Sequence, residues 1–340
     1  MNMPQKKSFQ HQHYAHCESG VMSLLLHHAG LPLSEPMAFG LAGALTFAYL
    51  PFVKLGGMPL VAYRSLPRAI IKGLRKNIGI ELKLETFQDP ARGTEALNRL
   101  LAEQRIVAAQ TSVFWLPYFP EEMRFHFNAH NLIIYGLEDE EYLISDPVFE
   151  HPVRCRVRDL EKARFVKGVM APKGLLYYIT GVPAAIDYRR VLPAVIKKNA
   201  RSMLKTPVPI AGIRGMRSLA RTIGRLQKKD PRYARLFLGH IVRMQEEIGT
   251  GGAGFRFIYA SFLQEAGKIL SCPDLETASQ MMTLVGDQWR EFALLAVKAI
   301  RCQKQKNSPD FAALRRKLES VSQAEADVYR TLLAIDLINP

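Results

Sequence analysis

The chain has 340 residues, of which 48% are hydrophobic, and a formal net charge of +15 at pH 7. This length exceeds one ordinary hydrophobic core, so two domains are expected. No apolar run follows the two N-terminal lysines, and glycines and a proline interrupt the most apolar stretch, residues 36–53. The sequence therefore predicts neither a secretory signal nor a membrane span. Four scattered cysteines without a CxxC pair predict a cytoplasmic protein without a disulfide framework.

The sequence of the N-terminal part predicts helices, loops and a strand near residues 106–114. Residues 18–29 predict a helix, because apolar side chains recur on one face and Gly30 ends the pattern. Residues 31–79 mix glycine, proline and aromatic residues, and they predict loops and short helices rather than a regular sheet. Asp89-Pro90 opens a predicted helix that runs to about residue 103, and the apolar run at 106–114 predicts a buried strand.

A β-hairpin is the clearest local prediction. The apolar, β-prone run NLIIYGL covers residues 131–137, acidic residues 138–141 form the turn, and YLIS returns at 142–145. Asp146-Pro147 then ends the return strand. The hairpin predicts a small antiparallel sheet.

Strand signals end soon after this hairpin. GLLYYIT at 174–180 predicts one more strand, and helical patterns take over beyond Pro183. The predicted domains are therefore residues 1–183, of α+β class, and residues 184–340, all-α and basic. The later helices are expected near 233–248, 255–270, 275–303 and 309–320, with one more beginning at a capping box formed by Ser322 and Glu325.

Most of the net positive charge is concentrated in one segment. Residues 185–243 hold fifteen Lys and Arg side chains against two acidic ones. One predicted helix face carries Arg214, Arg217, Arg221 and Arg225, and an apolar stripe follows another face. This basic face is either solvated, docked to an acidic carrier protein, or set against anionic lipid. Nucleic acid is the least favoured partner, because no aromatic residues suited to base stacking lie between the arginines.

Three residues have the order and spacing of a cysteine-enzyme site. Cys17 directly precedes a predicted helix, whose N-terminus favours a thiolate. His130 precedes the NLIIYGL strand and Asp146 ends the return strand, so the hairpin supplies a base and a group to orient it. The spacing predicts Cys17 as nucleophile, His130 as base and Asp146 as orienter. The alternative is a small buried thiol and a turn-opening aspartate.

The chain resembles the butirosin biosynthesis protein H family. Its opening resembles that family over HCESGVMSLLLHHAGLPLSEPMAFGLAGALTFAYL, and the block AHNLIIYGLEDEEYLISDP is similar to the family's His-strand-turn-strand-Asp block. The segments GTGGAGFRFIYASFLQEA and LVGDQWREFALLA resemble the helical domain that follows in many relatives. The family's N-terminal domain is similar to bacteriocin-processing cysteine peptidases, so the resemblance implies a papain-like fold.

The resemblance also implies an activity. The namesake of the family is an acyltransferase that moves an aminoacyl group from an acyl carrier protein to an aminoglycoside amine. Cys17 would accept the acyl group, His130 would deprotonate first Cys17 and then the acceptor, and Asp146 would hold the ring. The peptidase relatives place a glutamine six residues before the cysteine to support the oxyanion. That position is His11 here, so His11 and the neighbouring Gln12 are the candidate supports.

Two further segments are candidates for substrate contact. Phe39, Gly40, Gly43 and Phe47 could line an acyl or pantetheine groove, or they could be ordinary core. The glycines of residues 249–254 form a GxGxxG pattern, but the preceding residues read as helix, so a dinucleotide site is rejected. These glycines are expected to connect two helices.

A weaker reading is that the backbone amides of this glycine segment, with Arg256, hold the phosphate of a pantetheine arm. A metal site is not expected, because the histidines next to Cys17 have no second ligand pair at standard spacing.

The leading hypothesis is a cysteine-dependent acyltransferase of specialised metabolism. It would move an acyl or aminoacyl group from a carrier-protein thioester to the amine or hydroxyl of a small-molecule acceptor. No bound cofactor is expected, and the phosphopantetheine arm of the acidic carrier protein is the co-substrate. The alternatives are a cysteine peptidase or amidase of the same fold, and a non-catalytic scaffold that binds a carrier protein.

Overall fold

The chain divides into two compact units in the computed structural model, which describes residues 9–304 and 309–337. The first unit comprises residues 1–38 and 70–185, and the second comprises residues 39–69 and 186–340. The chain re-enters the second unit at residue 186, close to the expected boundary at 183. Residues 39–69 differ from the expectation, because they join the helical unit.

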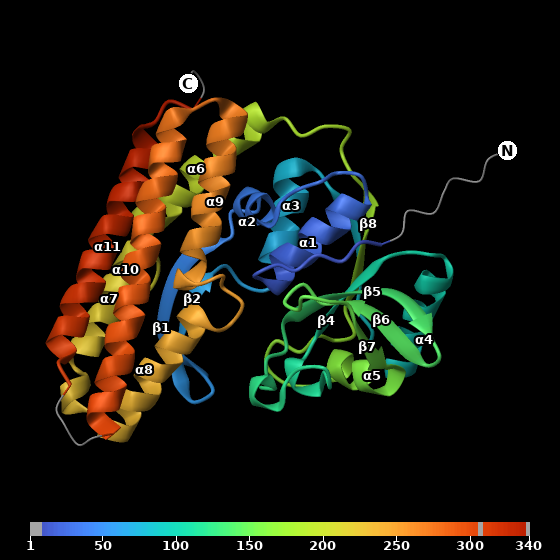
Figure 1. The fold of residues 1–340 in the computed structure, drawn as a ribbon, viewed down its shortest axis with the longest axis horizontal. Coiled ribbons are helices and arrows are strands. Elements are labelled where there is room, and N and C mark those ends of the chain that lie inside the picture. Colours follow the sequence, from blue (N-terminus) through green and yellow to red (C-terminus); the bar gives the residue numbers. More distant parts are fainter. Residues whose placement is uncertain (1–8, 305–308, 338–340) are drawn as a thin grey trace. The chain divides into compact units, whose positions relative to one another are not determined.

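The first unit is built on a six-stranded antiparallel sheet with the strand order β3-β8-β4-β5-β6-β7 (Figure 1). The strands are β3 (Glu81–Glu85), β4 (Val107–Thr111), β5 (His130–Glu138), β6 (Glu141–Ser145), β7 (Val153–Arg156) and β8 (Leu176–Gly181). Its helices are α1 (Cys17–His28), α3 (Ala69–Ile78), α4 (Pro90–Ala102) and α5 (Val157–Phe165), and α2 (Glu35–Leu41) begins in this unit.

Alternation along the strands separates two faces of this sheet. Leu132 and Ile134 of β5 join one hydrophobic core with Leu97 of α4 and Leu160 of α5. The intervening residues of β5 point to the opposite face, where α1 packs against β5. The predicted hairpin is confirmed as β5 and β6, and the predicted helices at 18–29 and 90–103 are confirmed as α1 and α4.

The prediction for residues 31–79 was wrong in part. The short helices α2 and α3 are present as expected, but the segment also contains a β-hairpin. The strands β1 (Leu45–Leu55) and β2 (Met58–Arg64) pair antiparallel, with positive φ at Gly56 and Gly57 in the turn. Prolines inside both strands and a register shift between Leu50 and Lys54 obscure the alternating pattern in the sequence.

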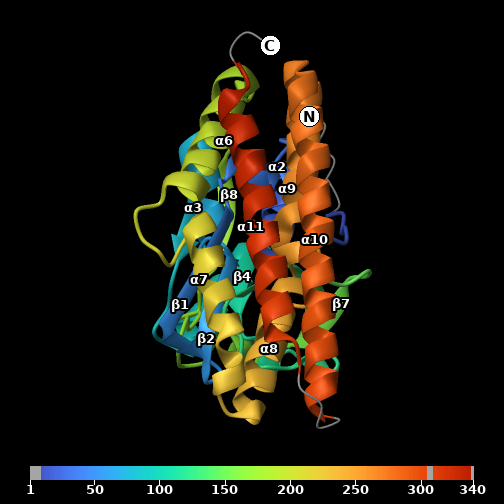
Figure 2. The same cartoon turned by 90° about the vertical axis from the view of Figure 1, so that its left-hand side faces the viewer.

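The second unit packs this hairpin against helices. The helices are α6 (Tyr188–Lys205), α7 (Gly212–Gly224), α8 (Pro231–Glu246), α9 (Arg256–Leu270), α10 (Pro273–Lys304) and α11 (Phe311–Ala334). Figure 2 shows α7, α11 and α10 running alongside one another. The described part of residues 184–340 contains helices and no strand, which confirms the predicted helical C-terminal part and the α+β class. No helix in the described ranges is both long and apolar enough to span a membrane.

One predicted helix start was wrong. The helix α11 continues through Ser322, whose hydroxyl donates to the carbonyl of Glu319 within the same helix. Glu325 does not complete a capping box, because its carboxylate binds the buried Arg256 side chain.

Candidate active site

Cys17 is the first residue of α1. His16 is the N-cap residue, with extended backbone angles, and its ring accepts a hydrogen bond from the backbone N–H of Ser19 at 3.3 Å. The Cys17 side chain is buried at 5% exposure. It therefore lies at the helix end where unpaired N–H groups stabilise negative charge.

The start of α1 is braced by the buried carboxylate of Glu35. One oxygen accepts from the N–H of Ala15 at 2.9 Å, and the other accepts from the N–H of His16 at 2.8 Å and the hydroxyl of Ser19 at 2.9 Å. Burial raises the pKa of Glu35, and these hydrogen bonds oppose the rise. Because the bonded groups flank Cys17, this brace fixes the backbone that carries the thiol.

The hairpin brings His130 and Asp146 into contact. Nε2 of His130 lies 2.6 Å from Oδ2 of Asp146, and both side chains are buried. The hydroxyl of Tyr118 donates to the same carboxylate oxygen at 2.9 Å, and the N–H of Val148 donates to the other at 3.3 Å. The ring of Phe119 meets His130 edge-on, with centroids 5.3 Å apart. Asp146 and Phe119 thus restrict the orientation of the imidazole ring.

The environment of His130 favours its charged form. Burial opposes the charge, but the carboxylate of Asp146 and the hydrogen bonds to Asp146 and Cys17 outweigh burial and raise the pKa of His130 to about 10. Since Nε2 faces Asp146, Nδ1 is the ring nitrogen left for Cys17. The structure therefore brings Cys17, His130 and Asp146 together, in the order that the sequence predicts, and the raised pKa of His130 favours the protonated ring.

A glycine in α1 allows the end of the hairpin to approach the cysteine helix. A Cβ atom on Gly20 would lie 2.8 Å from the side chains of both Pro147 and Tyr14, closer than packed carbons tolerate. The backbone N–H of Tyr14 also donates to the carbonyl of Pro147 at 2.6 Å. Pro147 follows Asp146 directly, so this close approach helps to set the position of the carboxylate relative to α1.

Asn131 is a site residue that the sequence interpretation missed. Its Nδ2 donates to the sulfur of Cys17 at 3.8 Å and to the carbonyl of Ala129 at 3.1 Å. Its Oδ1 accepts from the hydroxyl of Tyr177 at 3.0 Å. The available signal was an amide residue at the start of an otherwise apolar strand, directly after the candidate base.

The two predicted oxyanion supports have other partners. The ring nitrogens of His11 lie 2.7 Å from the hydroxyl of Ser145 and 3.1 Å from the carbonyl of Phe149. Oε1 of Gln12 accepts from the hydroxyl of Tyr14 at 2.9 Å. Support of an oxyanion by His11 would require those two contacts to be broken.

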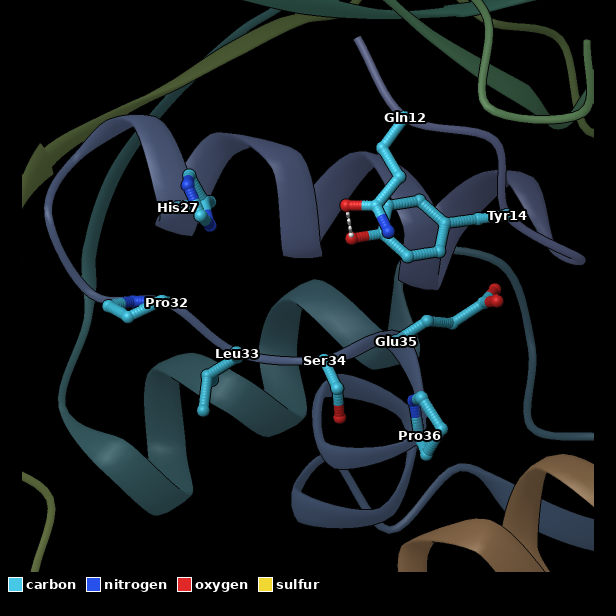
Figure 3. Close-up of a pocket in the computed structure, with 8 residues that line it drawn as sticks. All are labelled: Gln12, Tyr14, His27, Pro32, Leu33, Ser34, Glu35 and Pro36. Carbon is cyan, nitrogen blue, oxygen red and sulfur yellow. Dashed lines mark hydrogen bonds between the residues drawn. The ribbon is translucent and has the colours of Figure 1, made fainter. Parts of the chain in front are cut away.

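Gln12 and Tyr14 line a cavity of about 320 Å³ that also reaches His27 in the last turn of α1. Figure 3 shows the two side chains facing each other, with Ser34 coming from the loop that leads into α2 and Glu35 from the first position of α2. The remaining lining residues are Pro32, Leu33 and Pro36. The cavity therefore joins the segment before Cys17 to the segment that contains the Glu35 brace.

The predicted acyl groove is corrected by burial. Phe39 and Phe47 are fully buried in the second unit, where Phe39 stacks on Phe255 at 5.2 Å. A Cβ on Gly40 would lie 2.1 Å from the ring of Phe262, and Gly43 is an exposed turn residue with a φ of +67°. Side chains sealed in a packed core cannot line a groove, so Phe39, Gly40 and Phe47 have the core role, and Gly43 is a surface turn residue.

The predicted phosphate contact at Arg256 is also corrected. Its guanidinium is fully buried, forms two hydrogen bonds to the carboxylate of Glu325, and donates to the carbonyl of Gly254 at 2.6 Å. The glycine segment is a helix–helix connection between α8 and α9, as expected, with positive φ at Gly249, Gly251, Gly252 and Gly254. By contrast, the four arginines of α7 and its C-cap are exposed: Arg214, Arg217, Arg221 and Arg225.

These features define a class of scaffold. A cysteine at a helix start, facing a histidine and an aspartate of an antiparallel sheet, is the arrangement of papain-like cysteine enzymes. The chain belongs to the family defined by a domain of unknown function, DUF4872, whose family model matches residues 158–332. The model described as "Butirosin biosynthesis protein H, N-terminal" matches residues 16–147, which confirms the resemblance noted in the sequence.

Comparison with other proteins adds one distant structural likeness. No curated protein shows significant sequence similarity to the chain. A crystal structure described as a C39-like peptidase from Bacillus anthracis is similar over 52% of this chain and 96% of its own, at 13% identity and a TM-score of 0.37. A likeness this distant defines neither the activity nor the substrate.

Proposed function

We propose that the protein is a cysteine-dependent acyltransferase that takes an acyl or aminoacyl group from a carrier-protein thioester. The observation that carries the proposal is that the start of β5 and the end of β6 bring a His–Asp pair to the cysteine helix: Nε2 of His130 lies 2.6 Å from Oδ2 of Asp146, and Nδ2 of the adjacent Asn131 lies 3.8 Å from the Cys17 sulfur. An imidazolium beside a thiol at a helix N-terminus favours the thiolate, which is the nucleophilic form.

Both half-reactions use the same two side chains. The Cys17 thiolate attacks the thioester carbonyl carbon, and the bond from that carbon to the pantetheine sulfur breaks. His130 gives its proton to the departing sulfur and becomes neutral. The amine of the acceptor then attacks the acyl group on Cys17 and loses a proton to His130, which restores the ion pair.

The donor is proposed from charge and family membership. The exposed arginines of α7 form a basic face suited to an acidic protein, and acyl carrier proteins are acidic. The name of the matched N-terminal family model refers to the biosynthesis of butirosin, a specialised metabolite. A phosphopantetheine arm would present the thioester, and a small amine or alcohol would receive the acyl group.

The test is transfer from a loaded carrier. Acyl carrier proteins charged with different acyl groups are incubated with the protein and a panel of amines, and the acylated products are identified by mass spectrometry. Transfer that requires both the amine and Cys17 supports the proposal, and Cys17→Ser is the control. Hydrolysis of the thioester regardless of the amine would favour a hydrolase of the same fold. No loss of acyl groups across the panel would contradict the proposal.

A further inference from the structure

We propose that the side-chain amide of Asn131 is a catalytic oxyanion donor in this site. This inference rests on the proposed acyl transfer through Cys17. Nδ2 of Asn131 already donates to the Cys17 sulfur at 3.8 Å, and its side chain is buried at 3% exposure. It is therefore a desolvated N–H donor placed against the reacting atom.

The position suits the charge that develops during acyl transfer. When the thiolate attacks a carbonyl carbon, the new carbon–sulfur bond forms and the carbonyl electron pair moves onto oxygen. That oxyanion lies only two bonds from the sulfur, within reach of a donor that already contacts the sulfur. Collapse returns the electron pair to the carbonyl and expels the leaving group, which takes its proton from His130.

The amide is fixed before any substrate arrives. Oδ1 accepts from the hydroxyl of Tyr177, and one N–H of Nδ2 donates to the carbonyl of Ala129. These two contacts set which end of the amide faces Cys17, so the second N–H is directed at the sulfur. A donor held in this way does not need to reorganise during the reaction, which is the condition for strong stabilisation of an oxyanion.

Strand alternation places the side chain of Asn131 on the face of the sheet against which α1 packs. Adjacent residues of β5 point to opposite faces of the sheet. Asn131 shares the α1 side with Tyr177, whereas its neighbours Leu132 and Ile134 belong to the core on the other side. Asn131 thus approaches the sulfur from the sheet. Because Asn131 supplies the oxyanion donor, His11 is not needed for that role, and its contacts with Ser145 and Phe149 can remain intact.

The test compares two reactions of the same thiol. Acylation of Cys17 by p-nitrophenyl acetate passes through an oxyanion, whereas alkylation by iodoacetamide is a displacement that has none. Both rates are measured at Cys17 by mass spectrometry of its peptide, with Cys17→Ala giving the background. Asn131→Ala should slow acylation about 100-fold, the effect expected for loss of one oxyanion donor, with a much smaller effect on alkylation.

Two variants complete the design. Tyr177→Phe keeps the amide but removes its anchor, so acylation should slow by a smaller factor while alkylation stays close to that of the wild type. This variant carries the test if Asn131→Ala does not fold. Asn128→Ala is the matched control, because it removes a nearby buried amide that donates to the carbonyl of Val169 instead. It should leave the ratio of the two rates unchanged.

The outcomes separate the two proposals. If wild-type Cys17 is acylated and the Asn131 and Tyr177 variants keep the wild-type ratio of acylation to alkylation, the oxyanion role is wrong and the acyltransferase proposal stands. If Cys17 of the wild type is alkylated but never acylated, the acyltransferase proposal is wrong, and the role of Asn131 is wrong with it.

Discussion

His130 and Asp146 form a buried pair in which Nε2 of the ring lies 2.6 Å from Oδ2 of the carboxylate. His130 is the first residue of β5, and Asp146 directly follows the last residue of β6. These two strands form one hairpin, so a single hairpin creates the pair. Cys17, at the start of α1, is linked to this hairpin through Asn131, whose Nδ2 lies 3.8 Å from its sulfur, and it is among the groups that raise the pKa of His130. The chemistry of the thiol thus depends on local structure formed more than a hundred residues away.

The first prediction concerns the dependence of stability on pH. The folded-state pKa of His130 is raised to about 10, whereas a histidine in an unfolded chain titrates near ~6.5. The proton therefore stabilises the folded state fully below pH ~6.5, and this contribution is lost as the pH rises towards ~10. The free energy of unfolding of the wild type should fall through this window relative to that of His130→Gln, by up to roughly 5 kcal/mol.

Urea denaturation at pH values across this window measures the difference. The Gln variant lacks the titrating group but can still donate to Asp146, so the two proteins differ chiefly in this proton. A difference in unfolding free energy that does not change between pH 6 and pH 10 would contradict the raised pKa of His130.

The second prediction concerns the close approach at Gly20. Gly20→Ala places a Cβ about 2.8 Å from Pro147 and Tyr14, so α1 must move away from the end of the hairpin. Overpacking of this kind costs about 1–3 kcal/mol of stability, and acylation of Cys17 should slow because Asp146 shifts with Pro147.

Gly239→Ala is the matched control. Gly239 lies within α8, where the nearest atom to an added Cβ is 4.0 Å away. It should leave acylation unchanged and raise stability by about 0.5–1 kcal/mol, because alanine is the better helix former. Equal effects of the two substitutions on acylation would rule out a specific role for Gly20.

The third prediction concerns the buried pair in the second unit. The carboxylate of Glu325 accepts from Arg256, from Trp289 at 2.9 Å and from Tyr329 at 2.8 Å. Glu325→Gln leaves the buried guanidinium without a counter-charge and should cost about 3–5 kcal/mol. Glu319→Gln, in the exposed pair with Arg315, should cost at most ~1 kcal/mol.

Fluorescence of Trp289 reports this loss directly, because its ring nitrogen donates to Glu325. The chain has two tryptophans, and a Trp115→Phe background leaves Trp289 as the single probe. Equal destabilisation by the two glutamine substitutions would show that Arg256 does not depend on Glu325.

The fourth prediction concerns the basic face of α7. The double variant Arg217→Glu, Arg221→Glu reverses the charge of two exposed side chains. It should weaken binding of an acidic carrier protein at least tenfold at low salt, and wild-type binding should weaken steeply as salt rises. Calorimetry at two salt concentrations measures both effects.

Arg92→Glu is the control for this surface, because it changes an exposed arginine on α4 of the first unit. The control should bind like the wild type. Carrier binding that is insensitive to salt, or equally weakened by the Arg92 substitution, would contradict docking on α7.

The candidate triad was predictable because its parts are set by local signals. The helix at Cys17 follows from an apolar face that ends at a glycine, and the hairpin follows from two β-prone runs around an acidic turn. His130 and Asp146 flank that hairpin, so their proximity follows from strand pairing. The α+β class follows from the same patterns.

The missed features depend on contacts that are distant in the sequence. The strand β1 is held in part by Asn199, whose Nδ2 donates to the carbonyl of Leu45 at 2.7 Å across 154 positions. In the sequence, Arg256 has the features of a surface cation. The structure shows that it is bonded to Glu325, which lies 69 positions later. The role of Asn131 depends on its contacts with Tyr177 and Cys17, and no local sequence pattern predicts that these three residues lie close together.

The central claim is that Cys17 carries the acyl group between donor and acceptor. The most direct measurement is the intact mass of the protein after rapid mixing with an acylated carrier protein in the absence of an acceptor. We predict a mass increase equal to one acyl group, located on the Cys17 peptide, lost on addition of a reactive amine and absent in Cys17→Ala. An unmodified mass across a broad panel of acyl carriers, or an equal adduct on Cys17→Ala, would contradict the account.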